Sequence, residues 1–465
     1  MVASWVLATL AMLVMGPARA DAVEPGVVSD LAWYIPDSEK DRSVQVTQEL
    51  GSEWARIHVQ WREAEPAKGL LNEWWMAEYE EAVDRARAAG QQVVVMIYNA
   101  PAWAADDPTG NVPANPADFA AFASKLAERL RGKVAGYEVW NEPNFERFWN
   151  GGPDAAAYAD LLKAAYPAIH AADPAAKVVF GGLSGNDYPF LERAYAAGAK
   201  GNFDVLATHP YTYCGSSGPE EVRRRPDGRL TPDTFTAYRE LRATMAARGD
   251  TKPIWVTEFG WNTSGRKCDP GAGFWQGGVT AAKQAEYLTR AFEIFASDSY
   301  VEVAMWYSLR DPYWLVDNPT DPESSTGLVT VGFDRKPAFS AFKDFASRAP
   351  GTSGSTGTGG ATEPVSTATR VTKVKLRKRG TRVAGEVAGA AGGEVSIELE
   401  HRSGKSWRPV RTITAQVGSD GTFSASLGKL PKGKRRVRAT YSGTDEALPS
   451  SSGYISVRRK ARRNR

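Results

Sequence analysis

The sequence predicts a (β/α)8 barrel followed by a small all-β sandwich of immunoglobulin-like type. Between residues 25 and 348, short apolar runs typical of buried strands alternate with amphipathic helical patterns, and there are eight such runs. Near-continuous apolar strands are typical of a parallel sheet whose two faces are both covered. The competing fold, a doubly wound open sheet, needs a switch point in the strand order and usually a glycine-rich first turn, and the sequence shows neither.

The predicted elements alternate along the chain. Strands are expected at the apolar runs, at residues 26–32, 54–61, 91–98, 134–140, 177–181, 203–209, 253–258 and 301–308. Helices are expected where apolar residues recur every three to four positions, at residues 76–89, 116–130, 154–172, 189–197, 232–248, 281–296 and 337–347. Gly90 and Gly132 directly follow two of these helices, where glycine commonly ends a helix.

Two of the predicted strands end in a glutamate. The fourth strand runs into Asn-Glu-Pro, and because proline disfavours helical angles in the preceding residue, Glu142 is expected to be extended. The seventh strand ends in Thr-Glu-Phe-Gly, which contains Glu258. All strand C-termini of such a barrel open onto one face, and two carboxylates there are what glycoside hydrolysis needs. Either glutamate alone could be a solvated loop residue or a salt-bridge partner, but the pair favours catalysis.

The N-terminus has the pattern of a secretory signal peptide over residues 1–20. An uncharged apolar run, residues 5–15, precedes Ala18-Arg19-Ala20, although no lysine or arginine comes before it. The run is shorter than the roughly 20 apolar residues that span a bilayer, and no other stretch looks transmembrane. We therefore expect a secreted protein, extracellular or associated with the cell surface. In that setting the two cysteines, Cys214 and Cys268, suggest one disulfide, because both lie in loops after predicted strands.

The composition changes sharply after the predicted barrel. Residues 349–369 are rich in Gly, Ser and Thr and predict a flexible linker, whereas residues 370–457 alternate in the manner of short strands. Residues 366–465 contain 23 lysines and arginines but only 7 acidic residues, and residues 458–465 form a basic tail. This charge suggests attachment to an anionic cell-wall polymer or exopolysaccharide, or simply a solvated tail. Stacking aromatics are sparse here, so nucleic acid is not expected as a partner.

The barrel resembles the large clan of retaining glycosidases that carry both catalytic glutamates on strands four and seven, which includes glycoside hydrolase families 5 and 39. The resemblance covers residues 25–348 and rests on Asn-Glu-Pro and Thr-Glu-Phe-Gly in combination. It implies that Glu142 is the acid/base and Glu258 the nucleophile. Family 5 enzymes usually carry a histidine at the end of strand three, where this sequence has Tyr98-Asn99. That departure favours a family 39-like or unassigned member.

The resemblance also implies roles for five supporting residues. Asn141 matches the residue that hydrogen-bonds the sugar 2-hydroxyl, and Arg56 matches an arginine near the nucleophile. His209 and Tyr211 match a pair that lines the subsite of cleavage, and Trp306 matches its aromatic floor. A positive Arg56 and a Tyr211 hydrogen bond would favour ionised Glu258. Ordinary structural roles stay open: Arg56 in a barrel-bottom ion pair, His209 as a buried histidine and Trp306 in the core.

The sequence thus predicts a secreted, monomeric retaining β-glycosidase that acts on β-linked poly- or oligosaccharides without a metal or organic cofactor. Five tryptophans in loops after strands either line a sugar cleft or pack loops together: Trp61, Trp103, Trp149, Trp275 and Trp314. Their number favours an endo-acting enzyme with an open cleft. The alternatives are an exo-acting enzyme resembling a β-xylosidase and a non-catalytic protein for carbohydrate binding or wall attachment.

Overall fold

The chain forms two compact units, residues 1–353 and 354–465, which are described separately. The computed structural model describes residues 23–105, 111–268, 277–318 and 320–348 of the first unit. In the second it describes residues 373–379, 382–388, 393–403, 406–428, 433–441, 450–451 and 455–457. The predicted signal peptide, the predicted linker and the basic tail lie outside the described residues.

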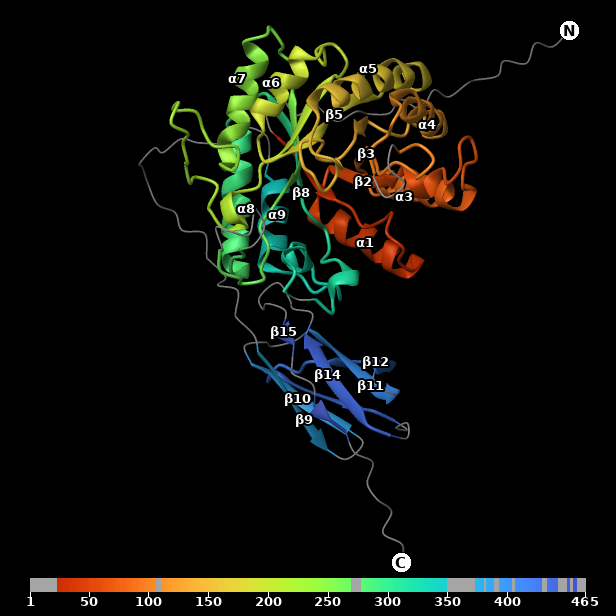
Figure 1. The fold of residues 1–465 in the computed structure, drawn as a ribbon. Coiled ribbons are helices and arrows are strands. Elements are labelled where there is room, and N and C mark those ends of the chain that lie inside the picture. The colour runs from red at the N-terminus through yellow and green to blue at the C-terminus, as the bar shows by residue number, and fades with distance from the viewer. Residues whose placement is uncertain are drawn as a thin grey trace, which may run out of the picture. The chain divides into compact units, whose positions relative to one another are not determined.

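The first unit is a closed barrel of eight parallel strands in the order β1 to β8, which confirms the predicted fold (Figure 1). The strands are β1 (Glu24–Val28), β2 (Trp54–Gln60), β3 (Gln92–Tyr98), β4 (Gly136–Val139), β5 (Lys177–Ser184), β6 (Val205–His209), β7 (Ile254–Phe259) and β8 (Val301–Trp306). The barrel closes where β1 pairs with β8, with Val27 opposite Trp306. Every strand therefore ends at the same face, as the sequence predicts.

Helices surround the strands (Figure 1). They are α1 (Asp37–Leu50), α2 (Trp61–Ala64), α3 (Glu73–Ala88), α4 (Pro116–Arg129), α5 (Ala155–Ala172), α6 (Tyr188–Ala196), α7 (Tyr238–Ala246), α8 (Ala281–Ala296) and α9 (Pro337–Ala346). Short 3-10 helices are η1 (Tyr213–Gly215), η2 (Phe235–Ala237), η3 (Tyr313–Leu315) and η4 (Pro322–Ser325). The sequence missed α1, because its charged residues obscure the apolar stripe; even Lys40 is buried there, paired with Glu78. No helix in the described part of the chain is long and apolar enough to cross a bilayer.

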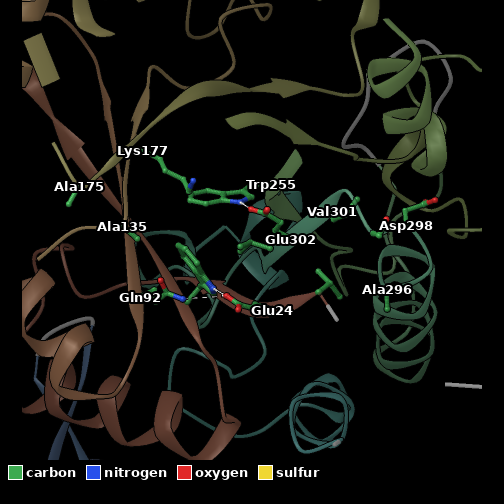
Figure 2. Close-up of a pocket in the computed structure, with 14 residues that line it drawn as sticks. Glu24, Gln92, Ala135, Ala175, Lys177, Trp255, Ala296, Asp298, Val301 and Glu302 are labelled. Carbon is green, nitrogen blue, oxygen red and sulfur yellow. Dashed lines mark hydrogen bonds between the residues drawn. The ribbon is translucent and has the colours of Figure 1, made fainter. Parts of the chain in front are cut away.

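Two tryptophans lie at the N-terminal end of the barrel: Trp255, which is labelled in Figure 2, and Trp54. The rings of Trp54 and Trp255 meet edge to face with centroids 4.9 Å apart, and both are buried. The indole of Trp54 donates to Glu24 at 2.5 Å, and that of Trp255 donates to Glu302 at 3.0 Å. A cavity of about 530 Å3 lies at this end, lined by these four residues and their neighbours.

The second unit contains two antiparallel sheets, which is consistent with the predicted immunoglobulin-like module. One sheet has the order β13-β10-β9, and in the other β12, β11 and β14 are joined by β15 and β16, which both pair with β14. The strands are β9 (Lys373–Arg379), β10 (Arg382–Ala388), β11 (Glu394–Ser403), β12 (Ser406–Gln416), β13 (Thr422–Ser426), β14 (Arg435–Tyr441), β15 (Ser450–Ser451) and β16 (Ile455–Ser456). Buried residues of both sheets, such as Val383, Phe423, Ile397 and Val437, form one core.

Candidate active site

Glu142 lies in a tight turn directly after β4, and not in the extended backbone that the sequence predicted. The strand ends at Val139, and the next residues include two with positive φ, Trp140 at 75° and Glu142 at 42°. Pro143 disfavours right-handed helical angles at Glu142, and the residue adopts a positive φ instead of the expected extended one. The amide of Glu142 donates to the carbonyl of Gly182 at 3.1 Å, so the neighbouring strand β5 holds the turn in place.

Two glycines in β5 let the turn and a histidine approach that strand closely. A Cβ at Gly181 would lie 2.6 Å from the carbonyl oxygen of Val139 and 2.7 Å from that of Trp140. A Cβ at Gly182 would lie 2.1 Å from Nε2 of His209. Any larger residue at either position would displace backbone or ring atoms, so these glycines fix how Glu142 and His209 are placed.

Arg56 joins three acceptors at the centre of the barrel. Its side chain is fully buried; Nε donates to Glu138 at 2.6 Å, Nη1 to Glu258 at 2.5 Å and Nη2 to Asn141 at 2.9 Å. Only the planar guanidinium of arginine can serve three partners in this way. Because Arg56 occupies the oxygen of Asn141, that amide has only its nitrogen left to offer as a donor to a ligand.

Glu258, the second-to-last residue of β7, is held as a carboxylate. Burial alone raises its pKa, but the positive charge of Arg56 and a hydrogen bond of 2.7 Å from Tyr211 lower it to about 2. The hydroxyl of Tyr211 keeps its own proton, since burial and the adjacent Glu258 raise its pKa well above the usual value. Glu258 is therefore ionised at any physiological pH.

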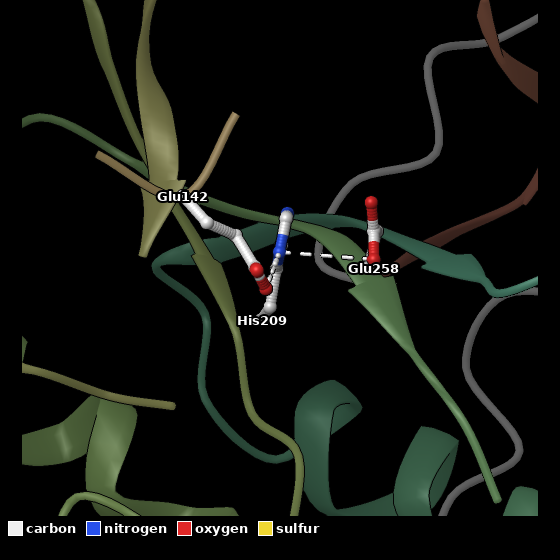
Figure 3. A group of neighbouring side chains, drawn as sticks. All are labelled: Glu142, His209 and Glu258. Carbon is white, nitrogen blue, oxygen red and sulfur yellow. Dashed lines mark hydrogen bonds and ion pairs between the residues drawn. The ribbon is translucent and has the colours of Figure 1, made fainter. Parts of the chain in front are cut away.

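Glu142 lies across His209 from Glu258 (Figure 3). Nδ1 of His209 is 3.0 Å from Glu142 and 3.7 Å from Glu258, and the nearest ligand atoms of all three residues lie within 4.8 Å of one another. Burial raises the pKa of Glu142, and the negative charge of Glu258 raises it further. The two carboxyl groups thus have opposite pKa shifts at the spacing of about 5 Å that retaining glycosidases use.

A buried chain of hydrogen bonds determines which nitrogen of His209 carries a proton. The hydroxyl of Thr257 donates to Glu138 at 3.0 Å, and Nε2 of His209 lies 3.1 Å from the same hydroxyl oxygen. A hydroxyl has a single proton, so Nε2 must be the donor to Thr257. In the neutral ring Nδ1 is then bare and accepts a hydrogen bond from the protonated carboxyl of Glu142.

A cavity of about 430 Å3 opens above these groups. Its lining comes from β1 to β4, the start of α3, β6, β7 and the segment after β8: Ala32, Trp33, Tyr34, His58, Gln60, Trp75, Tyr79, Met96, Tyr98, Asn141, Glu142, Arg147, Phe148, Tyr211, Glu258, Tyr307, Tyr313, Trp314 and Glu323. Aromatic rings dominate the wall, and three glutamates, one arginine and one histidine are among the polar groups. This combination suits a sugar, whose ring faces are apolar and whose edges carry hydroxyls.

The structure brings most of the predicted site residues together and places one elsewhere. Arg56, Asn141, His209 and Tyr211 all contact a glutamate of the pair or its arginine partner. Trp306 is fully buried, packs on Phe259 and donates its indole proton to Thr326, so it belongs to the core; the next residue, Tyr307, lines the cavity instead.

The loop tryptophans divide between the two functions that the sequence left open. Trp314 is half exposed and lines the cavity, whereas Trp61 and Trp149 are buried among other rings and Trp103 packs against Trp61. Trp275 lies outside the described residues. Cys214 and Cys268 are joined in a disulfide, with Cα atoms 5.4 Å apart, which ties the segment after β6 to the segment after β7.

Among the site residues that the sequence analysis missed are two ionisable side chains next to Arg56. Glu138 is completely buried in β4 and accepts from Arg56, Thr257 and the amide of Gly182. His58 lies two residues after Arg56 on the same face of β2, and its Nε2 is 3.1 Å from Nη1 of Arg56. Burial and that positive charge lower the pKa of His58 to about 3, so the ring is neutral and accepts the bond. The alternation of Arg56, His58 and Gln60 along one strand was the available signal.

The donor set of Glu142, His209 and Glu258 suits proton transfer better than metal binding. A cation held by these residues would lie about 2.0–2.2 Å from each carboxylate oxygen and imidazole nitrogen that binds it. The guanidinium of Arg56 already contacts Glu258, and a second positive charge beside it would be repelled. His209, moreover, is oriented by Thr257 to share a proton with Glu142.

Comparison with known families identifies related proteins. The model of the cellulase family, glycosyl hydrolase family 5, matches residues 20–297, more than half of the chain. The matching model is thus that of family 5, one of the two families named by resemblance, although Tyr98-Asn99 after strand three had favoured a family 39-like or unassigned member. No curated protein matches the chain significantly.

Solved structures share the fold at low sequence identity. A family 39 glycoside hydrolase from Bacteroides cellulosilyticus WH2 has a TM-score of 0.55 at 17% identity, covering 88% of this chain and 81% of that one. A variant of GH5_18 from Bifidobacterium longum subsp. longum ATCC 55813, in complex with Manβ1-4GlcNAc, has a TM-score of 0.53 at 16% identity. The match covers 70% of this chain and 78% of that one. The exo-β-1,4-mannosidase Op5Man5 from Opitutaceae bacterium strain TAV5 has a TM-score of 0.50 at 18% identity. The match covers 70% of this chain and 59% of that one.

Proposed function

This chain belongs to glycosyl hydrolase family 5 and is a glycosidase; we propose that it cleaves β-linked saccharides with retention of configuration, using Glu258 as nucleophile and Glu142 as acid/base. The observation that carries the proposal is the opposite pKa shift of two buried carboxyl groups less than 5 Å apart. A retaining mechanism needs one ionised and one protonated carboxyl group at about this distance.

In the first step, an ionised oxygen of Glu258 attacks the anomeric carbon while Glu142 gives its proton to the glycosidic oxygen. The bond between that oxygen and the anomeric carbon breaks, the leaving sugar departs as an alcohol, and Glu258 becomes covalently attached to the sugar. Arg56 and Tyr211 orient Glu258, and the amide nitrogen of Asn141 is free to donate to a sugar hydroxyl beside it.

In the second step, water takes the place of the leaving sugar. Glu258 has lost its charge in the ester, so the electrostatic cause of the raised pKa of Glu142 disappears and Glu142 can accept a proton from water. The resulting hydroxide attacks the anomeric carbon and releases Glu258 as a carboxylate. Transglycosylation would follow the same path with a sugar hydroxyl in place of water.

The test is a panel of aryl β-glycosides, β-linked oligosaccharides and polysaccharides, with Glu258→Ala and Glu142→Gln beside the wild type. Glu258→Ala should lose at least about 10^4-fold in kcat on every substrate, as removal of a nucleophile does. Glu142→Gln should lose far more on oligosaccharides than on aryl glycosides, whose leaving groups depart without a proton.

A matched control is Glu302→Gln, which changes a carboxylate at the opposite end of the barrel and should leave turnover unchanged. If Glu258→Ala keeps wild-type activity, the assigned nucleophile is wrong. If the folded wild type binds saccharides but turns over none of them, the alternative of a non-catalytic carbohydrate-binding protein is favoured.

Secretion and attachment to an anionic polymer are further parts of the proposal. The apolar run and Ala-x-Ala of the first 20 residues support export, and the disulfide fits an oxidising compartment. The excess of basic residues after residue 366 supports binding of the second unit to an acidic polysaccharide or cell-wall polymer. A sedimentation assay with acidic cell-wall polymer, with and without residues 366–465, tests this at low and high salt.

A further inference from the structure

An ion pair crosses the mouth of the barrel above the two catalytic glutamates. Nη1 of Arg147 lies 2.7 Å from Oε1 of Glu323, and both side chains line the same cavity as Glu142 and Glu258. Arg147 belongs to the segment after β4, and Glu323 belongs to η4 after β8. In a closed ring of eight strands, β4 and β8 are diametrically opposite, so this contact spans the open face from side to side.

The Arg147 end of the ion pair is held by neighbours on the segment after β3. Asn111 donates to the carbonyl of Arg147 at 3.2 Å, and the ring of Tyr98 packs on that of Phe148 with centroids 6.3 Å apart. The guanidinium of Arg147 also lies over the ring of Phe148, 5.4 Å from its centroid. This end of the ion pair is therefore anchored on two neighbouring segments of the barrel mouth.

Aromatic contacts close the remaining side of the cavity. Trp314, in the same segment as Glu323, meets Trp33 after β1 with ring centroids 4.4 Å apart. The hydroxyl of Tyr313 donates to the carbonyl of Tyr34 at 3.0 Å, and the Tyr34 ring meets Trp74 at the start of α3, 5.9 Å away. From β8 through β1 to α3 the wall is thus continuous.

The ring is completed between α3 and β3. The hydroxyl of Tyr79 in α3 accepts from the amide of Gln60 at 3.2 Å, and the side chain of Gln60 accepts from Asn99 after β3 at 3.2 Å. Contacts among described residues therefore encircle the cavity. They link α3 to β2, β2 to β3, and β3 to the segment after β4, and the ion pair of Arg147 and Glu323 closes the ring across the mouth. An encircled cavity is a pocket with one opening, whereas an internal bond of a polymer requires a groove open at both ends.

From this geometry we infer that the site accepts the non-reducing end of a short β-linked oligosaccharide, and that the Arg147–Glu323 pair is the specificity determinant that excludes internal bonds of polymers. The inference rests on the proposed function, because it concerns the same two glutamates. The glycone occupies the pocket, and the leaving sugar extends toward the opening. The volume of about 430 Å3 is in the lower part of the 300–1,000 Å3 range of small-molecule sites. The inferred pocket differs from the open cleft that the tryptophan content favours.

The experiment compares chain-length dependence in the wild type and in variants that remove the ion pair. The probes are β-1,4-linked gluco-, manno- and xylo-oligosaccharides of two to six units, the corresponding soluble polysaccharides and aryl β-glycosides. The wild type should release mono- or disaccharides from chain ends, with little fall in polymer viscosity for each bond cleaved. Arg147→Ala and Glu323→Ala should each raise the ratio of polymer to aryl-glycoside activity at least tenfold and add internal cleavage products.

Two controls separate the ion pair from general loosening of the loops. The exchange Arg147→Glu with Glu323→Arg restores an ion pair across the mouth and should return the ratio toward that of the wild type. Arg266→Ala removes a hydrogen bond to the carbonyl of Thr320 in the same region, outside the cavity lining, and should leave the ratio unchanged.

Three results would overturn the inference. A wild type that lowers polymer viscosity rapidly cleaves internal bonds and so contradicts the pocket directly. Single variants with an unchanged ratio show that the ion pair does not determine chain length. In both cases the proposed function still holds if the wild type hydrolyses aryl glycosides and Glu258→Ala abolishes that activity. A folded wild type that is silent on every probe overturns the proposed function, and the inference fails with it.

Discussion

The two ends of the barrel use the same kinds of residues for different purposes. At the N-terminal end, Glu24 and Glu302 accept hydrogen bonds from the indoles of Trp54 and Trp255 beside a cavity of about 530 Å3. At the C-terminal end, glutamates meet an arginine, a histidine and a tyrosine beside a cavity of about 430 Å3. A cavity alone therefore does not identify the site of chemistry. The difference lies in the partners, because only the C-terminal end combines charges that drive the pKa values of two carboxyl groups apart.

Among the variants that compare the two ends, the largest effect should follow from removing the guanidinium at the C-terminal end. In Arg56→Met, Glu138 and Glu258 lose their buried counter-charge, which should cost about 3–5 kcal/mol of unfolding free energy. Turnover should fall at least 10^2- to 10^3-fold, the usual cost of losing an electrostatic contact in an active site. Denaturant unfolding and kcat/KM on an aryl glycoside measure the two effects.

The pH profile of the same variant gives a sharper result. In the wild type the depressed pKa of Glu258 keeps this proposed nucleophile ionised down to about pH 2, so activity should be lost only as the pH falls through that value. Without Arg56 that pKa rises, and the acid limb of kcat/KM should move to higher pH. Arg56→Lys keeps the charge but loses the three-way geometry, so its acid limb should move less. An acid limb that stays in place in Arg56→Met would show that Arg56 does not tune the nucleophile.

The next effect concerns stability alone, at the N-terminal end. Trp255→Ala removes a buried ring that packs on Trp54 and bonds Glu302, and it should cost about 3–5 kcal/mol of unfolding free energy. Because these contacts lie at the opposite end from Glu142 and Glu258, both limbs of the kcat/KM profile should remain where they are. A shifted limb would mean that the two ends are electrostatically coupled. It would contradict the view that the N-terminal end contributes to stability alone.

Local sequence patterns predicted the barrel and the two glutamates well. Apolar runs at spacing typical of strands located all eight strands, and Asn-Glu-Pro and Thr-Glu-Phe-Gly marked Glu142 and Glu258 at the strand ends. The turn at Glu142 was not predicted correctly, because the positive φ depends on a hydrogen bond to Gly182 in the next strand. The roles of Glu138 and His58 depend in the same way on partners that the sequence does not place beside them.

The wall of the pocket could not be predicted from the sequence for a related reason. Arg147 and Glu323 are 176 residues apart, and the rings of Trp33 and Trp314 are also far apart in the chain. No local pattern marks such contacts, because they arise only when segments from opposite sides of the barrel meet at one face. Counting tryptophans suggested an open cleft, since the count does not distinguish rings that line the cavity from rings that pack loops.

The smallest predicted effect probes the hydrogen-bond chain behind the acid/base. The ionisable or polar groups that face Glu142 include His209 of β6, Glu258 of β7, Ser184 of β5, Tyr211 after β6 and, from its own segment, Arg147. Thr257→Val keeps the shape of the side chain but removes the acceptor of the Nε2 proton of His209 and the donor to Glu138. The ring is then free to carry its proton on Nδ1 and donate it to the carboxylate of Glu142.

That change of tautomer would stabilise ionised Glu142 and lower its pKa, so the proton needed in the first step would be lost at lower pH. The alkaline limb of kcat/KM should move down by about one pH unit, which corresponds to about 1.4 kcal/mol. Thr257→Ser retains the hydroxyl and should keep the wild-type limb, which separates the hydrogen bond from the packing of the side chain. An unchanged alkaline limb in Thr257→Val would show that Glu142 keeps its proton without help from His209. Burial beside Glu258 would then be enough to explain the raised pKa of Glu142.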